Sequence, residues 1–320
     1  MRIAMIGLGD IAQKAYLPLL ASDERITPLL CTRNPAVLEK LARQYRVAEC
    51  FTDVATLLAS RPDAVMIHAA TAVHRELAEQ CLRAGLPTFV DKPLCDNLAE
   101  AEALANLAIA QDCPLFTGFN RRYLPVMAEA RAQPLTELNW QKHRFALPGK
   151  ARDFMFDDFI HVLDSLCFYG GVPGGDFHAV LRPDAKDSSL LAGVSVSWQS
   201  GDRAISGSMN RSAGITEERI DAYGDNLSLH LENCTRGIIA RDKQAQTLSP
   251  NDWQPVLVQR GFAAMLDHWY QQIEIGKADS ELIASYLHGH RLAEQLVALA
   301  DKRAKAGWKS EGCEFEVRGG

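Results

Sequence analysis

The chain has 320 residues, of which 47% are hydrophobic and 23% charged, a composition typical of a globular protein long enough for two domains. A net charge of −6 gives no electrostatic reason to expect nucleic acid or an anionic membrane as a partner. No apolar run reaches the length of a membrane span, and the chain opens with a core strand rather than an export signal, so we predict a cytoplasmic protein. The eight cysteines are scattered without a C-x-x-C pair, which favours reduced thiols and predicts no metal site.

The first twelve residues predict a nucleotide-binding site. Residues 3–6 form an apolar run without a polar break, as expected of a strand buried on both faces of a parallel sheet. Gly7-Leu-Gly-Asp-Ile-Ala12 follows directly, with the G-x-G-x-x-A spacing of the dinucleotide fingerprint. In that pattern Gly7 permits the tight turn and Gly9 lets the backbone approach a pyrophosphate. Asp10, Ile11 and Ala12 then open the helix whose N-terminus meets the negative charge. The alternative is a tight strand–helix turn without a ligand.

Strand and helix signals alternate through residues 1–120. We expect strands at 26–30, 64–69, 88–90 and 115–117, and helices at 72–84 and from 96 or 97 to 110. Asn34-Pro35 opens a further helix, with Asn34 as the N-cap and Pro35 at the first helical position. Regular alternation of this kind predicts an α/β fold with a doubly wound parallel sheet, and we assign 1–120 to an NAD(P)-binding Rossmann domain.

The pattern changes after about residue 120. We expect a strand at 135–146, a helix at 157–169, and then strand after strand from 177 to 248, where apolar and polar residues alternate with a period of two. Ser200-Gly-Asp202 and Gly224-Asp-Asn226 are typical of hairpin turns. Two helices, near 260–275 and 280–303, close the chain. Residues 121–320 are therefore predicted to form an α+β domain on a largely antiparallel sheet.

The end of the second predicted strand bears on the choice of cofactor. An NAD-preferring site places an acidic residue there, about 20 residues past the glycines, to hold the ribose 2′-hydroxyl. This chain has Thr32 and Arg33, which are able to bind a 2′-phosphate without repelling it. We therefore predict NADP in preference to NAD. The alternative for Arg33 is a solvated surface charge.

Lys92 lies at the carboxyl end of a strand, in Asp91-Lys92-Pro93. In an open α/β sheet this edge is where ligands bind, and Pro93 restricts the turn. An ammonium fixed beside a nicotinamide polarises a carbonyl or stabilises a developing alkoxide. Taken alone, a lysine in such a place is more often an ordinary surface residue.

The segment 157–164 carries a candidate proton relay. On a regular helix Asp157 and His161 are four residues apart and Asp164 is three further on, so all three share one face. A histidine held by a carboxylate is a positioned acid/base with a pKa near working pH. The alternative is that the acids only favour the helix N-terminus while His161 is a satisfied side chain. Asp158 is three residues before His161, so either carboxylate is a candidate for orienting it.

Together these motifs resemble the glucose–fructose oxidoreductase/inositol dehydrogenase/MocA (Gfo/Idh/MocA) family. The resemblance runs through nearly the whole chain and rests on the glycine loop, Asp91-Lys-Pro93, Gly118-Phe-Asn-Arg-Arg122 and Asp157-x-x-x-His161-x-x-Asp164. Within the family the chain is most similar to the bacterial MviM-type (virulence factor) oxidoreductases, on the runs 68–74, 90–93 and 142–144. Asp91 stands where the family usually has glutamate, and Ala70-Thr71-Ala72 where it often has Asn-Pro.

The resemblance implies roles for individual residues. Lys92 contacts nicotinamide and substrate, His161 is the acid/base, and Asp157 is the carboxylate beside it. Thr71 and His74 lie near the nicotinamide ribose, and the Lys92–Pro93 bond is cis. Among the weaker candidates after the last predicted Rossmann strand, Asn120 and Arg122 are predicted to contact substrate, although Arg121 and Arg122 have the alternative of pairing with acids. Lys142 and Arg144 share one face of a strand, which meets a polar or anionic substrate, an oligomer interface or solvent.

These observations predict an NAD(P)-dependent oxidoreductase that transfers a hydride between nicotinamide and a sugar, polyol or related hydroxyl or carbonyl compound. In the oxidative direction His161 accepts the hydroxyl proton, Lys92 stabilises the oxyanion and Asp157 orients His161. Two alternatives stay open: a nucleotide-binding regulator or sensor without turnover, and a lyase or glycosidase that uses a tightly bound cofactor transiently. The family's open sheet further implies a homodimer or homotetramer.

Overall fold

A computed structural model of the protein describes residues 1–308 and 314–317. Its contacts divide the chain into two compact units, and each unit is described by itself below. The first unit contains Met1–Phe119 and Phe262–Leu287, and the second contains Asn120–Gly261 and the described residues from His288 onward. The segment Phe262–Leu287 thus belongs to the first unit, although the predicted domain boundary assigns it to the second domain.

The first unit is built on a six-stranded parallel sheet with the order β3-β2-β1-β4-β5-β6. This is the doubly wound order predicted from the strand–helix alternation, with the switch point beside β1. The strands are β1 (Arg2–Ile6), β2 (Thr27–Cys31), β3 (Cys50–Phe51), β4 (Ala64–Ile67), β5 (Thr88–Val90) and β6 (Leu115–Thr117). The helices are α1 (Leu17–Ser22), α2 (Pro35–Tyr45), α3 (Val54–Ala59), α4 (His74–Arg83), α5 (Leu98–Ala110), α10 (Phe262–Ile275) and the first residues of α11 (Ser280–Ala306).

The two faces of this sheet are covered differently. Aliphatic residues of α4 and α5 pack against one face in a large buried cluster. On the other face Trp269 of α10 packs against Phe89 and Phe116, with ring centroids 6.0 and 5.7 Å apart. This aromatic contact explains why the segment Phe262–Leu287 belongs to the first unit. Asn34 caps α2 by accepting hydrogen bonds from the amides of Ala36 and Val37, as predicted.

The second unit is built on a nine-stranded sheet with the order β14-β13-β12-β11-β7-β10-β9-β8-β15. β7 and β10 run parallel and the other neighbours run antiparallel, so the predicted largely antiparallel sheet is confirmed. The strands are β7 (Leu135–His143), β8 (Phe177–Pro183), β9 (Leu191–Ser200), β10 (Arg203–Asn210), β11 (Glu217–Gly224), β12 (Leu227–Glu232), β13 (Arg236–Arg241), β14 (Gln244–Leu248) and β15 (Glu314–Val317). Both predicted hairpins join antiparallel neighbours, β9 to β10 and β11 to β12.

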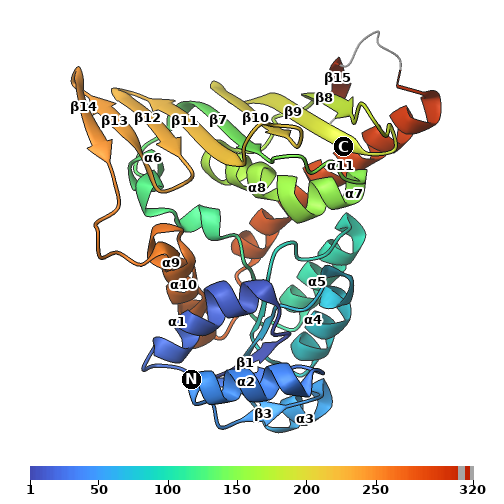
Figure 1. Cartoon of the computed structure of the whole chain (residues 1–320), viewed down its shortest axis with the longest axis vertical. Coiled ribbons are helices and arrows are strands. Elements are labelled where there is room, and N and C mark those ends of the chain that lie inside the picture. Colours follow the sequence, from blue (N-terminus) through green and yellow to red (C-terminus); the bar gives the residue numbers. More distant parts are fainter. Residues whose placement is uncertain (309–313, 318–320) are drawn as a thin grey trace. The chain divides into compact units, whose positions relative to one another are not determined.

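Helices cover one face of this sheet (Figure 1). They are α6 (Ala128–Arg131), α7 (Ala151–Asp153), α8 (Ile160–Tyr169) and the later part of α11, while α9 (Val256–Gln259) contacts the 3-10 turn Pro125–Met127. α8 packs closely on β10 because Gly207 has no side chain; a Cβ there would lie 2.6 Å from Cδ1 of Leu166. The helix predicted from residue 157 begins earlier, as the π-helical turn Phe154–Phe159 that leads into α8. Among the described residues no helix is both long and apolar enough to cross a membrane.

Candidate functional site

The glycine loop of the first unit follows β1 and precedes a helix, as predicted. Gly7 has φ +88°, and a Cβ on it would lie 2.6 Å from the amide nitrogen of Ala69. Only glycine fits this turn without strain. A Cβ added to Gly9 would meet no heavy atom within 4 Å, so the loop leaves open space at that position. Ala12 is fully buried and begins the π-helical turn Ala12–Tyr16. A tight turn, an open approach and a helix start are the features that a pyrophosphate requires.

Thr32 and Arg33 follow β2, beside the same edge of the sheet. Arg33 is exposed, and its guanidinium has no acidic partner within the part of the chain that the structure describes. The position where an NAD-preferring fold places a carboxylate therefore carries an uncompensated cation. These residues fit a nicotinamide dinucleotide, and a free guanidinium suits a phosphate on the ribose.

Lys92 is half-buried at the end of β5, and the Lys92–Pro93 peptide is cis, as predicted. Its neighbour Asp91 accepts a hydrogen bond from the Tyr16 hydroxyl at 2.9 Å. Burial raises the pKa of the Asp91 carboxyl above its ordinary value, although Lys92 and Tyr16 act in the opposite direction. Tyr16 lies in the π-helical turn after the glycine loop, so the loop helix and the Lys92 turn are joined through this bond.

His74 and Thr71, both predicted near the nicotinamide ribose, differ in their surroundings. Thr71 is half-buried in the short 3-10 turn Thr71–Val73. His74 is buried, with Nδ1 2.9 Å from the carbonyl oxygen of Pro93 and Nε2 3.0 Å from that of Ala69. Both ring nitrogens of His74 thus face carbonyl oxygens, which only accept, and a neutral ring donates to one of them, so His74 connects the Lys92–Pro93 turn with the segment that contains Ala69.

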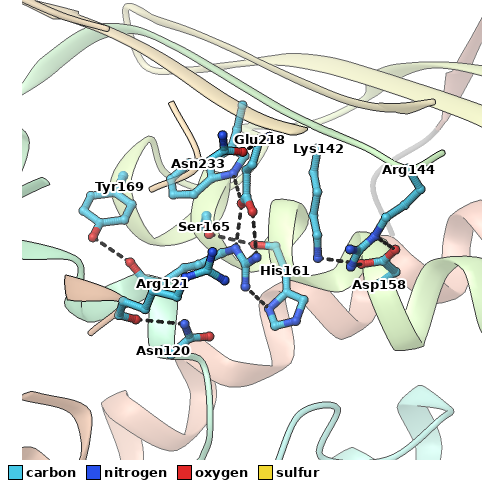
Figure 2. A network of polar contacts seen from close by, with 12 residues as sticks. Asn120, Arg121, Lys142, Arg144, Asp158, His161, Ser165, Tyr169, Glu218 and Asn233 are labelled. Atoms are coloured by element: carbon cyan, nitrogen blue, oxygen red, sulfur yellow. Dashed lines mark hydrogen bonds and ion pairs between the residues drawn. The ribbon is translucent and has the colours of Figure 1, made fainter. Parts of the chain in front are cut away.

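His161 of the second unit lies on α8 and is half-buried. Its Nδ1 lies 2.9 Å from Nη1 of Arg121 (Figure 2). A guanidinium has no acceptor, so Arg121 donates and Nδ1 accepts. The neutral ring then carries its proton on Nε2.

Arg121 is itself fixed by Glu218 of β11. Its Nε and Nη2 donate to Oε1 and Oε2 of Glu218, each at 2.7 Å. Trp140 Nε1 donates to Oε1 of the same carboxylate at 2.8 Å, and the Tyr169 hydroxyl donates to the Arg121 carbonyl at 3.0 Å. Burial alone raises the pKa of Glu218, but Arg121 outweighs it and holds that pKa at about 2. The guanidinium that faces His161 is thus held by a permanently charged bidentate pair.

The contacts of Asp158 bear on which of the two carboxylates, Asp157 or Asp158, orients His161. That carboxylate is buried and pairs with Lys142 and Arg144 (Figure 2), and also with Arg211, rather than with His161. Burial raises its pKa, but the contacts with Arg144 and Lys142 outweigh burial and hold the pKa below its ordinary value. Asp157 is exposed and lies within the π-helical turn, where hydrogen bonds run from i to i+5. Its spacing to His161 is therefore not that of a regular helix.

Two substrate contacts predicted from the sequence have other partners in the structure. Arg122 is fully buried and forms a bidentate pair with Asp164, Nη2 to Oδ1 at 2.6 Å and Nε to Oδ2 at 2.9 Å. Asp164 therefore does not share the exposed side of α8 with Asp157. Asn120 is buried and donates from Nδ2 to the carbonyl of Arg260 at 2.9 Å. The 3-10 turn Asn120–Tyr123 explains this outcome, because it directs the two consecutive arginines to different carboxylates.

Glu218 was not among the site residues predicted from the sequence, and Arg121 and Lys142 each had alternative roles there. Glu217-Glu218-Arg219 has the composition of a solvated charge run, and only the alternation along β11 buries the middle residue. One signal was available: in the register of β7 and β11, Glu218 is opposite Lys142. Within residues 1–308 and 314–317 no group of three or more His, Cys, Asp and Glu side chains is placed to hold a metal ion.

Comparison with known proteins agrees with this geometry. Residues 1–119 match the family model described as oxidoreductase family, NAD-binding Rossmann fold. A Gfo/Idh/MocA family oxidoreductase from Vibrio cholerae is 44% identical, with a TM-score of 0.90, over 95% of this chain and 99% of that one. The dehydrogenase MviM from Clostridium difficile is 26% identical, with a TM-score of 0.85, over 93% and 99% of the two chains. The myo-inositol dehydrogenase Hyg17 of Streptomyces leeuwenhoekii is 36% identical over 136 residues, 42% of this chain and 41% of that protein.

Proposed function

Because this chain belongs to the Gfo/Idh/MocA family of NAD-binding oxidoreductases, we propose that it exchanges a hydride with a hydroxyl or carbonyl carbon of a sugar- or polyol-like substrate. The observation that carries this proposal is the glycine loop, with its obligatory glycine at position 7 and open space at position 9. A bound nicotinamide supplies the hydride donor or acceptor. The Streptomyces relative is named a myo-inositol dehydrogenase, which supports a ring carrying hydroxyl groups as the substrate.

We assign the proton chemistry to Nε2 of His161. Arg121 donates to Nδ1, so the neutral ring holds its proton on Nε2 and donates a hydrogen bond to a substrate oxygen. In the oxidative direction Nε2 accepts the hydroxyl proton only in the other neutral tautomer, which forms when Arg121 releases Nδ1 and the ring proton moves from Nε2 to Nδ1. Asp157 is proposed to stabilise the ring once it is charged.

Lys92 is proposed to stabilise negative charge on the substrate oxygen. Its ammonium is on a turn that Pro93 restricts and that His74 and the Tyr16–Asp91 bond hold from two sides. A cation held in advance stabilises an oxyanion without reorganisation during the reaction.

The assignment is tested with His161→Ala and Lys92→Ala, assayed by NADPH absorbance with myo-inositol and a panel of hexoses. Each variant is expected to lower kcat by about 100-fold or more while NADPH affinity changes less than about threefold. Lys277→Ala, which changes an exposed lysine between α10 and α11, is the matched control for Lys92→Ala and retains wild-type kcat. A normal kcat in either test variant would contradict the proposed roles.

We propose NADP as the preferred cofactor on the basis of Thr32 and the unpaired Arg33. Arg33→Ala is expected to weaken NADPH binding by about tenfold or more and NADH binding by less than about twofold. Arg43→Ala, an exposed arginine on α2, is the control and leaves both affinities unchanged. Equal losses of affinity for NADPH and NADH in Arg33→Ala would contradict the contact between Arg33 and the 2′-phosphate.

We further propose that the face of the second-unit sheet without helices mediates a homodimer or homotetramer (Figure 1). Half-buried polar side chains line that face, among them Asn139 and Ser206, which are hydrogen-bonded at 2.7 Å. Light scattering at micromolar concentration measures the mass directly, and a value of one chain would contradict this proposal.

A further inference from the structure

One buried carboxylate in the second unit is surrounded by three cations. Oδ1 of Asp158 lies 2.5 Å from Nζ of Lys142 and 2.7 Å from Nη2 of Arg144. Oδ2 accepts from Nε of Arg144 at 2.7 Å and from Nη2 of Arg211 at 3.2 Å. The side chains of Lys142 and Arg211 are only 5% and 7% exposed. A single carboxylate thus serves three cations, two of which are almost fully withdrawn from water.

Several donors in this cluster lack an acceptor. The Lys142 ammonium has three N–H groups, and across the described residues Asp158 is its only hydrogen-bond or ion-pair partner. Nε of Arg211 is buried without a hydrogen-bond partner. Nη1 of Arg144 likewise has no acceptor in the described part of the chain. Buried donors without acceptors are unfavourable, so these groups are arranged for an acceptor that the chain does not supply.

The local charge balance also has a positive excess. The interacting cations are Arg121, Lys142, Arg144 and Arg211, and the carboxylates that act on them are Asp157, Asp158 and Glu218. Burial, and after it the charge of Arg121, lowers the pKa of Lys142 to about 7, although Asp158 and Glu218 raise it. A further anion beside the ammonium offsets this excess.

We propose that Lys142 and Arg144 form an anion-binding subsite that receives a carboxylate or phosphate group of the substrate. This inference rests on the proposed function, because it names the class of compound with which the hydride is exchanged: an acidic sugar or polyol derivative. Arg144 lies at the solvent side of the subsite, since its side chain is 32% exposed and its Nη1 has no acceptor among the described residues. Lys142, which is 5% exposed, lies on the buried side. Guanidinium and ammonium donors together suit either anionic group.

The experiment is a calorimetric titration of the full chain with saturating NADPH against D-glucose, D-glucuronate and D-glucose 6-phosphate. These compounds differ only at the sixth carbon, and the same set built on D-galactose covers the epimer. At least one acidic compound is expected to bind about tenfold or more tightly than its neutral parent. The two acids distinguish carboxylate from phosphate recognition.

Variants connect that preference to the subsite. Arg144→Gln is expected to reduce the acid-to-neutral affinity ratio to below about threefold, and Arg144→Lys to retain part of it. Arg219→Gln, which removes an exposed arginine of β11, leaves the ratio unchanged. Equal affinities for acidic and neutral compounds, or no binding of any acid at millimolar concentration, would overturn the subsite. An acid preference that Arg144→Gln leaves intact would overturn it equally.

The titration also separates this inference from the hydride chemistry. His161→Ala is expected to lose turnover and to keep the preference for the acid. Turnover of a neutral compound without any acid preference would leave the proposed function standing and remove the subsite. Tight binding of an acid without turnover of any compound would leave the subsite standing and remove the proposed function.

A pH series gives a second readout. The groups that act on Lys142 are Arg121, Arg144, Asp158 and Glu218, and each of these stays charged near neutral pH. The ratio of the D-glucuronate affinity to the D-glucose affinity is therefore expected to fall as the pH rises through about 7, because Lys142 loses its proton. D-Glucose 6-phosphate is left out of this series, because a phosphate monoester itself titrates near about pH 6. Lys142→Met is expected to lower the ratio and to abolish this pH dependence. A pH dependence that persists in Lys142→Met would contradict the role of Lys142.

Discussion

Different physical effects fix the geometry of the nucleotide-binding loop and of the cluster around His161. In the first unit the decisive feature is missing side chains, because Gly7 touches the Ala69 backbone and Gly9 faces open space. In the second unit the decisive feature is buried charge, with Arg121 tied to Glu218, Arg122 to Asp164, and Asp158 to three cations. Sterics therefore dominate one half and electrostatics the other. The two halves are expected to respond differently to substitution and to pH.

The largest effect is expected where a buried charge loses its partner. Asp164→Asn removes the carboxylate that pairs with the buried Arg122 guanidinium, and should lower the free energy of unfolding by about 3–5 kcal/mol in urea titrations. The double variant Arg122→Met/Asp164→Leu removes both charges and should recover most of that loss. A double variant no more stable than Asp164→Asn would mean that shape, rather than charge, governs this site.

The next effect separates the two glycines of the loop. Gly7→Ala places a Cβ against the Ala69 backbone at positive φ and should lower the free energy of unfolding by about 2–4 kcal/mol. Gly9→Ala should change stability by less than about 1 kcal/mol and still weaken NADPH binding, because its Cβ occupies the space of the pyrophosphate. Equal stability losses in the two variants would contradict the assignment of the tight turn to Gly7 and of cofactor access to Gly9.

A smaller, pH-dependent effect is expected from the first unit. Burial lowers the pKa of His68 to about 3, and neither of its ring nitrogens has a hydrogen-bond partner. The unfolded chain binds the proton below about pH 6.5, so stability is full above that pH and declines below it, by about 1 kcal/mol on reaching about pH 5.5. His68→Leu should remove this part of the acid sensitivity in urea titrations at the two pH values. An unchanged pH dependence would show that other groups cause it.

The smallest effect belongs to exposed charges. Arg83 pairs with Glu79 on α4 at 2.7 Å, but its side chain is 62% exposed. Arg83→Ala should change the free energy of unfolding in urea titrations by less than about 0.5 kcal/mol. A larger loss would contradict the small weight given to exposed ion pairs.

The same contrast explains what could be predicted from sequence. The glycine loop, the Asn34 cap and the parallel strands depend on local patterns, and the structure confirms them. The strand period of two likewise predicted the second sheet. The contacts of His161 were not predictable, because Arg121 and Glu218 are 97 residues apart and meet only through the pairing of distant strands. The phase of Asp157 was missed because a π-helical turn interrupts the expected helix.

The position of α10 has a consequence for the order of folding. Trp269 covers Phe89 and Phe116, so residues 1–119 alone would expose an aromatic face of their sheet to water. During synthesis on the ribosome this face stays uncovered until nearly the whole chain has been made. β7 likewise lacks both of its neighbours until β10 and β11 are made, because they follow it in sequence and flank it in the sheet. Long-range pairings of this kind slow folding, so the nascent chain has two surfaces that require protection from aggregation until its last helices emerge.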